Sequence, residues 1–161
     1  MQELNGMTSS MTLGLLVALG AGIAIGLQGM FTNITGQALG PLRGGFAIHI
    51  AGSIVGGLMV GYMMMTNPNV EAIQLTPRVI MFAFLGGTSG MMILMGIAFA
   101  FPRIGQVAGQ GALIFAQMAV AIFVDTFALA GGDPIPFDWR RILGLLVLAL
   151  GTYLLLPQQS S

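Results

Sequence analysis

Three glutamines and one aspartate interrupt an apolar stretch of the chain, and they are the residues best placed to do chemistry. Gln106, Gln110, Gln117 and Asp125 lie within QVAGQGALIFAQMAVAIFVD, which is long enough to cross a bilayer. On a helix the three amides fall within about 40° of one another, and the carboxylate follows about 60° beyond them. Polar groups in hydrocarbon cost several kcal/mol unless they are satisfied. This stripe is therefore expected to face protein or a water-filled cavity rather than lipid.

Asp125 is the only acid well inside an apolar segment, and two interpretations of it stand side by side. An intramembrane carboxylate can take up and release protons, which would couple solute movement to a proton gradient. However, Asp125 lies near the end of its segment, about 12 Å from the expected midplane. There it could instead form a structural ion pair with Arg140 or Arg141.

Two further amides and the single histidine complete the candidate pathway. Gln28 and Asn33 lie about 140° apart on a regular helix, so they line one face only if the helix unwinds at neighbouring glycines. Such amides suit a neutral or weakly charged solute. The alternative is hydrogen bonding between helices, which is worth about 0.6 kcal/mol on average. His49 is either a proton shuttle or an imidazole packed between helices.

Several classes of function lack the residues they need. One histidine, one intramembrane acid and no cysteine argue against a metal site. The sequence has no nucleophile–base–acid set, no phosphate-binding glycine loop and no paired carboxylates. No catalytic residue and no cofactor is therefore predicted, and an enzyme is not expected. Net charge is zero and every basic residue is an arginine, which leaves no basic patch for nucleic acid.

The elements that must position these residues are apolar helices. Of 161 residues, 56% are hydrophobic and only 6% are charged, whereas a soluble domain carries about 25% charged residues. Prolines punctuate the chain where helices are expected to stop. They leave five apolar runs, at about 11–39, 44–65, 78–101, 103–130 and 139–156. We interpret each run as a transmembrane helix, which predicts an all-α integral membrane bundle of five spans in a single domain.

Glycines at helical spacing predict where these helices touch. Small residues four apart let helix backbones approach closely in a bilayer, where packing replaces the hydrophobic effect. The alternative is that glycine is simply frequent in membrane helices. Packing is expected at Gly22 with Gly26, Gly52 with Gly56, Gly57 with Gly61, and Gly105 with Gly109.

The arginines give only a weak orientation signal. Five spans place Arg78, Arg140 and Arg141 on the side of the N-terminus, and Arg43 and Arg103 on the other side. Orientation follows an excess of Lys and Arg on the cytoplasmic side, and three against two is almost none. The chain is therefore expected to insert both ways and to form an antiparallel dimer, equivalent to the inverted repeats of larger transporters. The alternative is a modest bias toward an internal N-terminus.

The order of polar motifs resembles a known family. LQGMFTN and QALGP in the first span precede FAIHIAG in the second, and AQMAVAIFVD in the fourth precedes TFALAGGDPIPFDWRRILGLLVLALG. This order is similar to that of the YdcZ-type family of the drug/metabolite transporter superfamily. The resemblance implies a small five-span protein of the bacterial inner membrane, and family members occur as dual-topology proteins, oppositely oriented pairs or fused ten-span forms. It carries over these positions: Gln28, Asn33, Gln117, Asp125, Pro136, Arg140 and Arg141.

The predicted function is transport of a small solute by an antiparallel dimer, with the glutamine stripe along the path and Asp125 as the candidate for proton coupling. The inference that the protein is a transporter comes from the family resemblance and not from the spacing of the polar residues. The expected partners are a small solute, the bilayer, and a second copy or an oppositely oriented paralogue. Two alternatives stay open: a non-transporting subunit that binds partner proteins through glycine-rich helix faces, and a passive channel. The identity of the solute and the direction of transport do not follow from the sequence.

Overall fold

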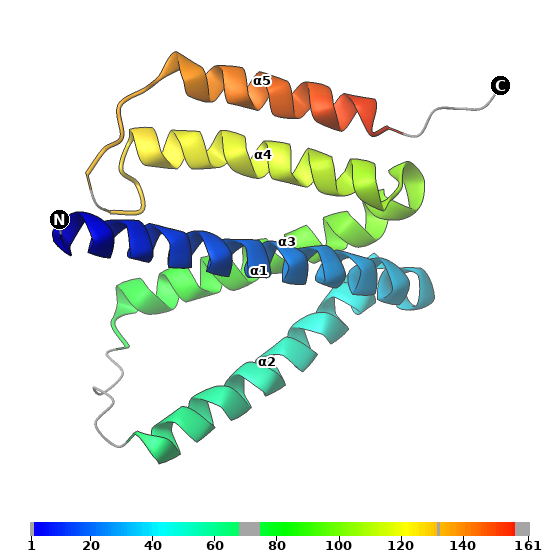
Figure 1. The fold of residues 1–161 in the computed structure, drawn as a ribbon. Helices are drawn as coiled ribbons and strands as arrows, with labels where there is room; N and C mark the ends of the chain where they lie inside the picture. Colours follow the sequence, from blue (N-terminus) through cyan, green and yellow to red (C-terminus); the bar gives the residue numbers. More distant parts are fainter. Residues whose placement is uncertain (1, 68–74, 132, 157–161) are drawn as a thin grey trace.

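Five helices make up the computed structural model of the chain (Figure 1). The structure describes residues 2–67, 75–131 and 133–156, and side chains from residue 11 onward. The helices are α1 (Gln2–Leu39), α2 (Pro41–Thr66), α3 (Pro77–Ile104), α4 (Gln106–Thr126) and α5 (Trp139–Leu154). Within these described ranges no strand occurs, so the predicted all-α class is confirmed.

Four of the helices are long and apolar enough to cross a membrane, namely Met11–Leu39 of α1 and the whole of α2, α3 and α4. α5 has 16 residues and rises about 24 Å, which is short of a hydrocarbon core of about 30 Å. Trp139, Arg140 and Arg141 stand at its N-terminal end, where such side chains extend a span into the interface. The chain is thus an all-α membrane bundle, and the fifth crossing stays a prediction.

The chain reverses direction at glycines. Gly40, between α1 and α2, has φ +83°, and Gly105, between α3 and α4, has φ +81°. This left-handed region suits glycine because it has no Cβ. Pro102, expected to end a helix, instead lies inside α3, which continues to Ile104. A proline removes one N–H near the helix end, and α3 stops where Gly105 permits the turn.

The observed helix limits differ from the expected ones accordingly. α4 begins at Gln106 and ends at Thr126, rather than running over 103–130. The segment after it turns back, because the amides of Ala128 and Ile135 both donate to the carbonyl oxygen of Asp125, at 3.3 and 3.0 Å. Pro68 and Pro157, also expected at segment edges, lie outside the described residues.

α1, α2 and α3 meet through residues with little or no side chain. A Cβ added to Gly36 would lie 2.4 Å from the Cβ of Ala98 in α3, and one added to Gly44 would lie 2.8 Å from the backbone nitrogen of Gly36. Thr32 is fully buried beside this crossing, and its hydroxyl donates to the carbonyl oxygen of Gln28 at 2.8 Å. The crossing is therefore made backbone against backbone.

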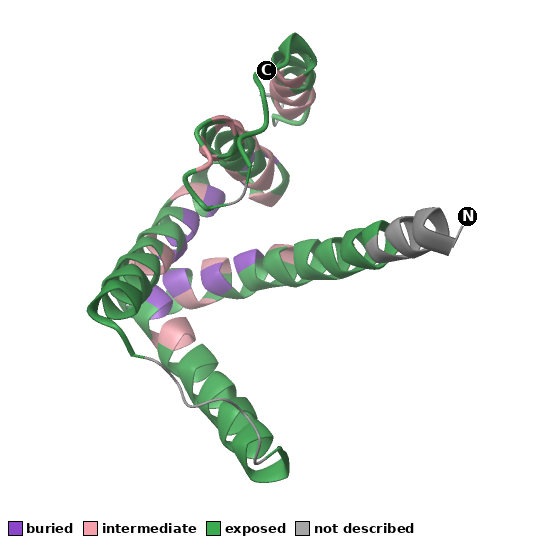
Figure 2. Ribbon diagram, turned by 90° about the vertical axis from the view of Figure 1, so that its left-hand side faces the viewer, coloured by how far each residue is buried: buried purple, intermediate pink, exposed green. Residues whose placement is uncertain are grey.

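The buried apolar side chains continue this crossing toward α4. They are Leu94, Ile97, Ala98 and Phe101 of α3 and Ala108 of α4. The ring of Phe101 fills the space over Gly109, where an added Cβ would lie 2.4 Å from it. Beyond this small core the helices diverge like the arms of a V (Figure 2). Residues 11–25 of α1 and 51–66 of α2 are all exposed.

Most of the glycine pairs predicted to pack helices lie on these diverging parts. A Cβ added at any of six of them would meet nothing within 4 Å: Gly22, Gly26, Gly52, Gly56, Gly57 and Gly61. Among the described residues, no neighbouring helix therefore packs on the open side of these six glycines, although the carbonyl oxygen of Gly26 accepts a hydrogen bond from Gln106 on α4. Gly109 does pack, against Phe101, and Gly105 serves the turn. Contacts within the chain run through Gly36, Gly44 and Gly45 instead.

The two ends of the bundle carry the arginines in the grouping expected from the sequence. The starts of α1, α3 and α5 lie toward one end, and the turns that follow α1 and α3 lie toward the other (Figure 1). Arg78 is the second residue of α3, and Arg140 and Arg141 follow the first residue of α5. Arg43 and Arg103 flank the two turns at the opposite end.

Candidate functional site

Two of the three stripe glutamines lie against the backbone of α1. The side-chain amide of Gln106 donates from Nε2 to the carbonyl oxygen of Gly26 at 3.2 Å. The Oε1 of Gln110 is buried and has no hydrogen-bond partner among the described residues. It would lie 3.4 Å from a Cβ added to Gly29, so the bare backbone of α1 gives it room.

A hollow of about 590 Å³ between α4 and α5 opens beside these amides. Its polar lining comes from Gln106, Gln110 and Thr152, and the remaining lining residues are glycine or apolar. The two helices come close here, since a Cβ added to Gly111 would lie 2.9 Å from Cγ2 of Thr152. The side chains of Gln106, Gln110 and Thr152 thus line a space large enough for a small molecule. The Gln106 amide itself donates to α1, and the Thr152 hydroxyl donates to the carbonyl oxygen of Leu148.

The structure does not bring the other predicted amides to this hollow. Gln117 is exposed on α4 and lies outside its lining. Gln28 is also exposed. Asn33 is half-buried, and its Oδ1 accepts a hydrogen bond from Nε2 of Gln37, one turn along the same helix, at 2.9 Å. The first-span amides are therefore engaged locally or exposed.

His49 packs between α2 and α3. Its ring lies against Gly90, where an added Cβ would stand 3.0 Å from Cε1 and 3.3 Å from Nε2. Nε2 is buried and has no hydrogen-bond partner among the described residues. In the same described part of the chain, no three His, Cys, Asp or Glu side chains gather as metal ligands would.

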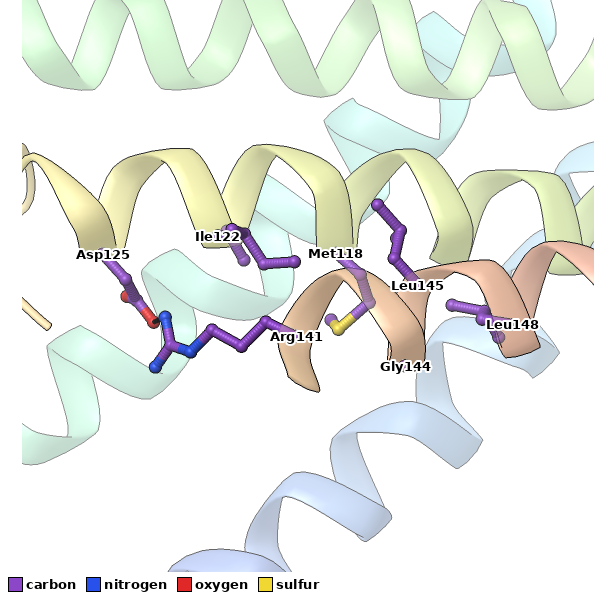
Figure 3. Close-up of a pocket in the computed structure, with 8 residues that line it drawn as sticks. Met118, Ile122, Asp125, Arg141, Gly144, Leu145 and Leu148 are labelled. Atoms are coloured by element: carbon purple, nitrogen blue, oxygen red, sulfur yellow. Dashed lines mark hydrogen bonds and ion pairs between the residues drawn. The ribbon is translucent and has the colours of Figure 1, made fainter. Parts of the chain in front are cut away.

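Asp125 forms an ion pair across the α4–α5 hairpin (Figure 3). Its Oδ2 lies 3.4 Å from Nη1 of Arg141, and the Asp125 side chain is 46% exposed. Arg140, the other candidate partner, donates its backbone N–H to Oδ1 of Asp138, the N-cap of α5. Asp125 is thus turned toward α5, whereas Gln106 and Gln110 are turned toward α1.

The ion pair stands at one end of an apolar groove that sequence reasoning did not find. The groove has a volume of about 360 Å³. Besides Asp125 and Arg141, its lining comes from Met118, Ala121, Ile122, Gly144, Leu145 and Leu148 (Figure 3). The antiparallel pairing of the last two predicted spans was the available signal, because it brings the end of one beside the start of the next.

These features define a multi-pass membrane protein in which some polar side chains lie between helices and others line open hollows beside them. The chain belongs to the family described as "Putative inner membrane exporter, YdcZ", whose model matches residues 13–154. The protein is therefore a membrane transporter of the drug/metabolite transporter type, located in the inner membrane. No curated protein and no solved structure matches the chain.

Proposed function

We propose that the chain carries a small solute across the inner membrane as an antiparallel dimer of two oppositely inserted copies. Membership of an exporter family supports transport. The observation that supports a dimer is the large exposed surface area of a single copy. That surface is 12,651 Å², against roughly 7,600 Å² for a compact chain of 16.7 kDa.

The excess is roughly 5,000 Å² for one copy, more than the roughly 1,000–2,500 Å² that each partner commonly buries in an obligate interface. A single copy therefore leaves ample surface for a second copy to cover. The exposed parts of α1 and α2, residues 11–25 and 51–66, carry glycines with open space around them, among them Gly22, Gly52 and Gly56. A second copy could approach their backbones closely there. The near balance of arginines at the two ends supports insertion in both orientations.

The path we propose runs past Gln106 and Gln110. The amides offer both donors and acceptors, which suits a neutral or weakly charged polar solute. The Oε1 of Gln110 is unpartnered and buried on the α1 side, and rotation of this side chain toward the hollow would offer it to such a solute as an acceptor. In an antiparallel dimer the two copies of this site would be related by a two-fold axis in the membrane plane, as the halves of inverted-repeat transporters are.

The geometry supports an ion pair at Asp125 more strongly than proton coupling. The carboxylate is held toward Arg141 on α5, away from the amides that face α1. We therefore place Asp125 outside the solute path and outside the coupling step.

The direct experiment is solute uptake into vesicles reconstituted with the purified chain. We expect uptake of a small polar solute that saturates with concentration and falls in Gln110→Leu. Currents without saturation would instead identify a passive channel. A protein that co-purifies stoichiometrically, without any solute-dependent stabilisation of the chain, would favour the non-transporting subunit.

A further inference from the structure

The contact between Asp125 and Arg141 is longer than expected for an ion pair whose role is only to hold two helices together. A single contact of 3.4 Å joins Oδ2 to Nη1. A tight bidentate pair would use two parallel and shorter hydrogen bonds. Because the Arg141 side chain is also 28% exposed, both partners keep hydrogen-bonding capacity for a third group.

The groove beside the pair is apolar along its length. Met118 and Ile122 on α4 and Leu145 and Leu148 on α5 lie along it, on the side of the pair that leads away from the helix ends (Figure 3). Gly144 leaves it open, since a Cβ added there would meet nothing within 4 Å. A hydrocarbon chain fits such a surface, and a polar solute does not.

The groove is placed where a lipid would enter it. Asp125 is the last residue but one of α4, and Arg141 is the third residue of α5, so both stand at one end of the hairpin. α4 is long and apolar enough to span the bilayer, so its end is expected near the headgroup interface, and the groove runs from there toward the middle of the helix. Among the described helices α5 packs on α4 alone, which leaves the groove open sideways to lipid.

We propose that this groove binds a phospholipid whose headgroup carries both a phosphate and a primary ammonium. The phosphate accepts hydrogen bonds from the Arg141 guanidinium, the ammonium donates to the Asp125 carboxylate, and an acyl chain lies along the groove. This headgroup can enter the ion pair and leave neither partner without an opposite charge. The site is independent of the proposed solute path.

Other headgroups fail to provide a suitable partner for both Asp125 and Arg141. An anionic headgroup without a cation would satisfy Arg141 but bring no positive charge to the carboxylate of Asp125, even where a headgroup hydroxyl donates to it. A choline headgroup carries a quaternary nitrogen, which has no N–H to donate to Asp125. The pair therefore selects the primary ammonium by charge and by hydrogen bonding together.

The test is lipid binding to the full purified chain, measured by native mass spectrometry. Phosphatidylethanolamine, phosphatidylglycerol and phosphatidylcholine with identical acyl chains are added in turn. We expect phosphatidylethanolamine to bind about tenfold more tightly than either other lipid, because phosphatidylglycerol brings no cation to Asp125 and phosphatidylcholine brings no N–H donor. Equal binding of the three lipids would overturn the proposal.

Variants locate the site, each with a matched control. Asp125→Asn and Arg141→Gln should lose the preference for phosphatidylethanolamine, while Asp133→Asn and Arg140→Gln, outside the groove lining, should keep it. Gly144→Val should block the acyl chain, and its Cβ has open space around it. Gly86→Val on α3, where a Cβ likewise meets nothing within 4 Å, is its control.

Three results would contradict the lipid site. Gly144→Val could bind lipid like the unaltered chain, or Asp125→Asn could keep the full headgroup preference. Phosphoethanolamine without acyl chains, or the amino acid leucine, could bind as tightly as the lipid, which would make the site one for soluble zwitterions. If the ion-pair variants fail to fold, the headgroup comparison on the unaltered chain and the Gly144→Val pair decide the question.

Discussion

Single residues in α4 differ in how their polar groups are satisfied. Gln106 donates to the carbonyl oxygen of Gly26 at 3.2 Å, whereas the buried Oε1 of Gln110 has no partner among the described residues. An unpaired buried acceptor costs about 1–3 kcal/mol. A solute that donates a hydrogen bond would remove this cost. A substitution of Gln110 is therefore expected to weaken solute binding without lowering the stability of the protein.

We predict that Gln110→Leu lowers solute uptake about tenfold while leaving the free energy of unfolding unchanged or raising it by about 1 kcal/mol. The substitution removes the unpaired acceptor and keeps most of the side-chain volume. Uptake into vesicles and thermal unfolding in detergent measure the two effects. Gln117→Leu is the matched control, because Gln117 is exposed outside the hollow and its loss should leave uptake unchanged. Normal uptake by Gln110→Leu would remove the proposed path.

The ion pair of Asp125 leads to a second prediction. Asp125→Asn should keep solute uptake driven by a pH gradient, because the carboxylate faces Arg141 rather than the amides on the α1 side. It should also cost less than about 1 kcal/mol of stability, as exposed ion pairs do. Uptake is measured in vesicles without ethanolamine lipids, so that lipid binding does not enter the comparison. If Asp125→Asn abolished uptake driven by the pH gradient, Asp125 would have to take part in proton coupling.

Helical periodicity predicted part of this site. It placed Gln106, Gln110 and Gln117 on one stripe, but it does not say which part of a stripe meets another helix. α1 passes α4 beside its first turns, at Gly26 and Gly29, so the first two amides are covered and Gln117 is left exposed. Pairing of Asp125 with an arginine was one of two interpretations. The choice of Arg141 depends on where the loop lets α5 begin.

At the scale of helices, α1, α2 and α3 pack closely because glycines, which have no side chain, lie at their contacts. Gly36 and Gly44 face each other across the turn at Gly40, and Gly36 also meets Ala98. Spacing within one helix cannot reveal contacts formed across a turn, which is why the predicted pairs Gly22–Gly26 and Gly52–Gly56 lie in open space instead. The positions of the apolar helices themselves followed from composition and proline punctuation.

We predict that Gly44→Ala destabilises the single chain by about 1–3 kcal/mol, because the new Cβ would lie 2.8 Å from the backbone nitrogen of Gly36 and neither helix can yield cheaply. Gly56→Ala on the same helix should leave the monomer as stable or make it about 1 kcal/mol more stable, because a Cβ there meets nothing within 4 Å. Reversible unfolding of monomer in detergent compares the two. Equal effects would contradict the crossing described for α1 and α2.

The whole molecule is an open bundle with a small core. Only five apolar side chains are buried among the described residues, and residues 11–25 of α1 and 51–66 of α2 are exposed beyond that core. The sequence predicted a membrane bundle, and it could not predict how far the helices splay. The angle between the helices depends on which helix ends form the close contacts at glycines.

The measurement that tests the account most directly is side-specific labelling of single cysteines with a membrane-impermeant maleimide. The chain contains no cysteine, so Leu75→Cys and Ser160→Cys, made separately, give clean reporters and leave every arginine in place. Leu75 is exposed before the start of α3, and Ser160 lies beyond the described residues. Labelling of each site from both sides of the membrane is the predicted result, since an antiparallel dimer needs both orientations. Labelling of each site from one side only would contradict the homodimer of oppositely inserted copies.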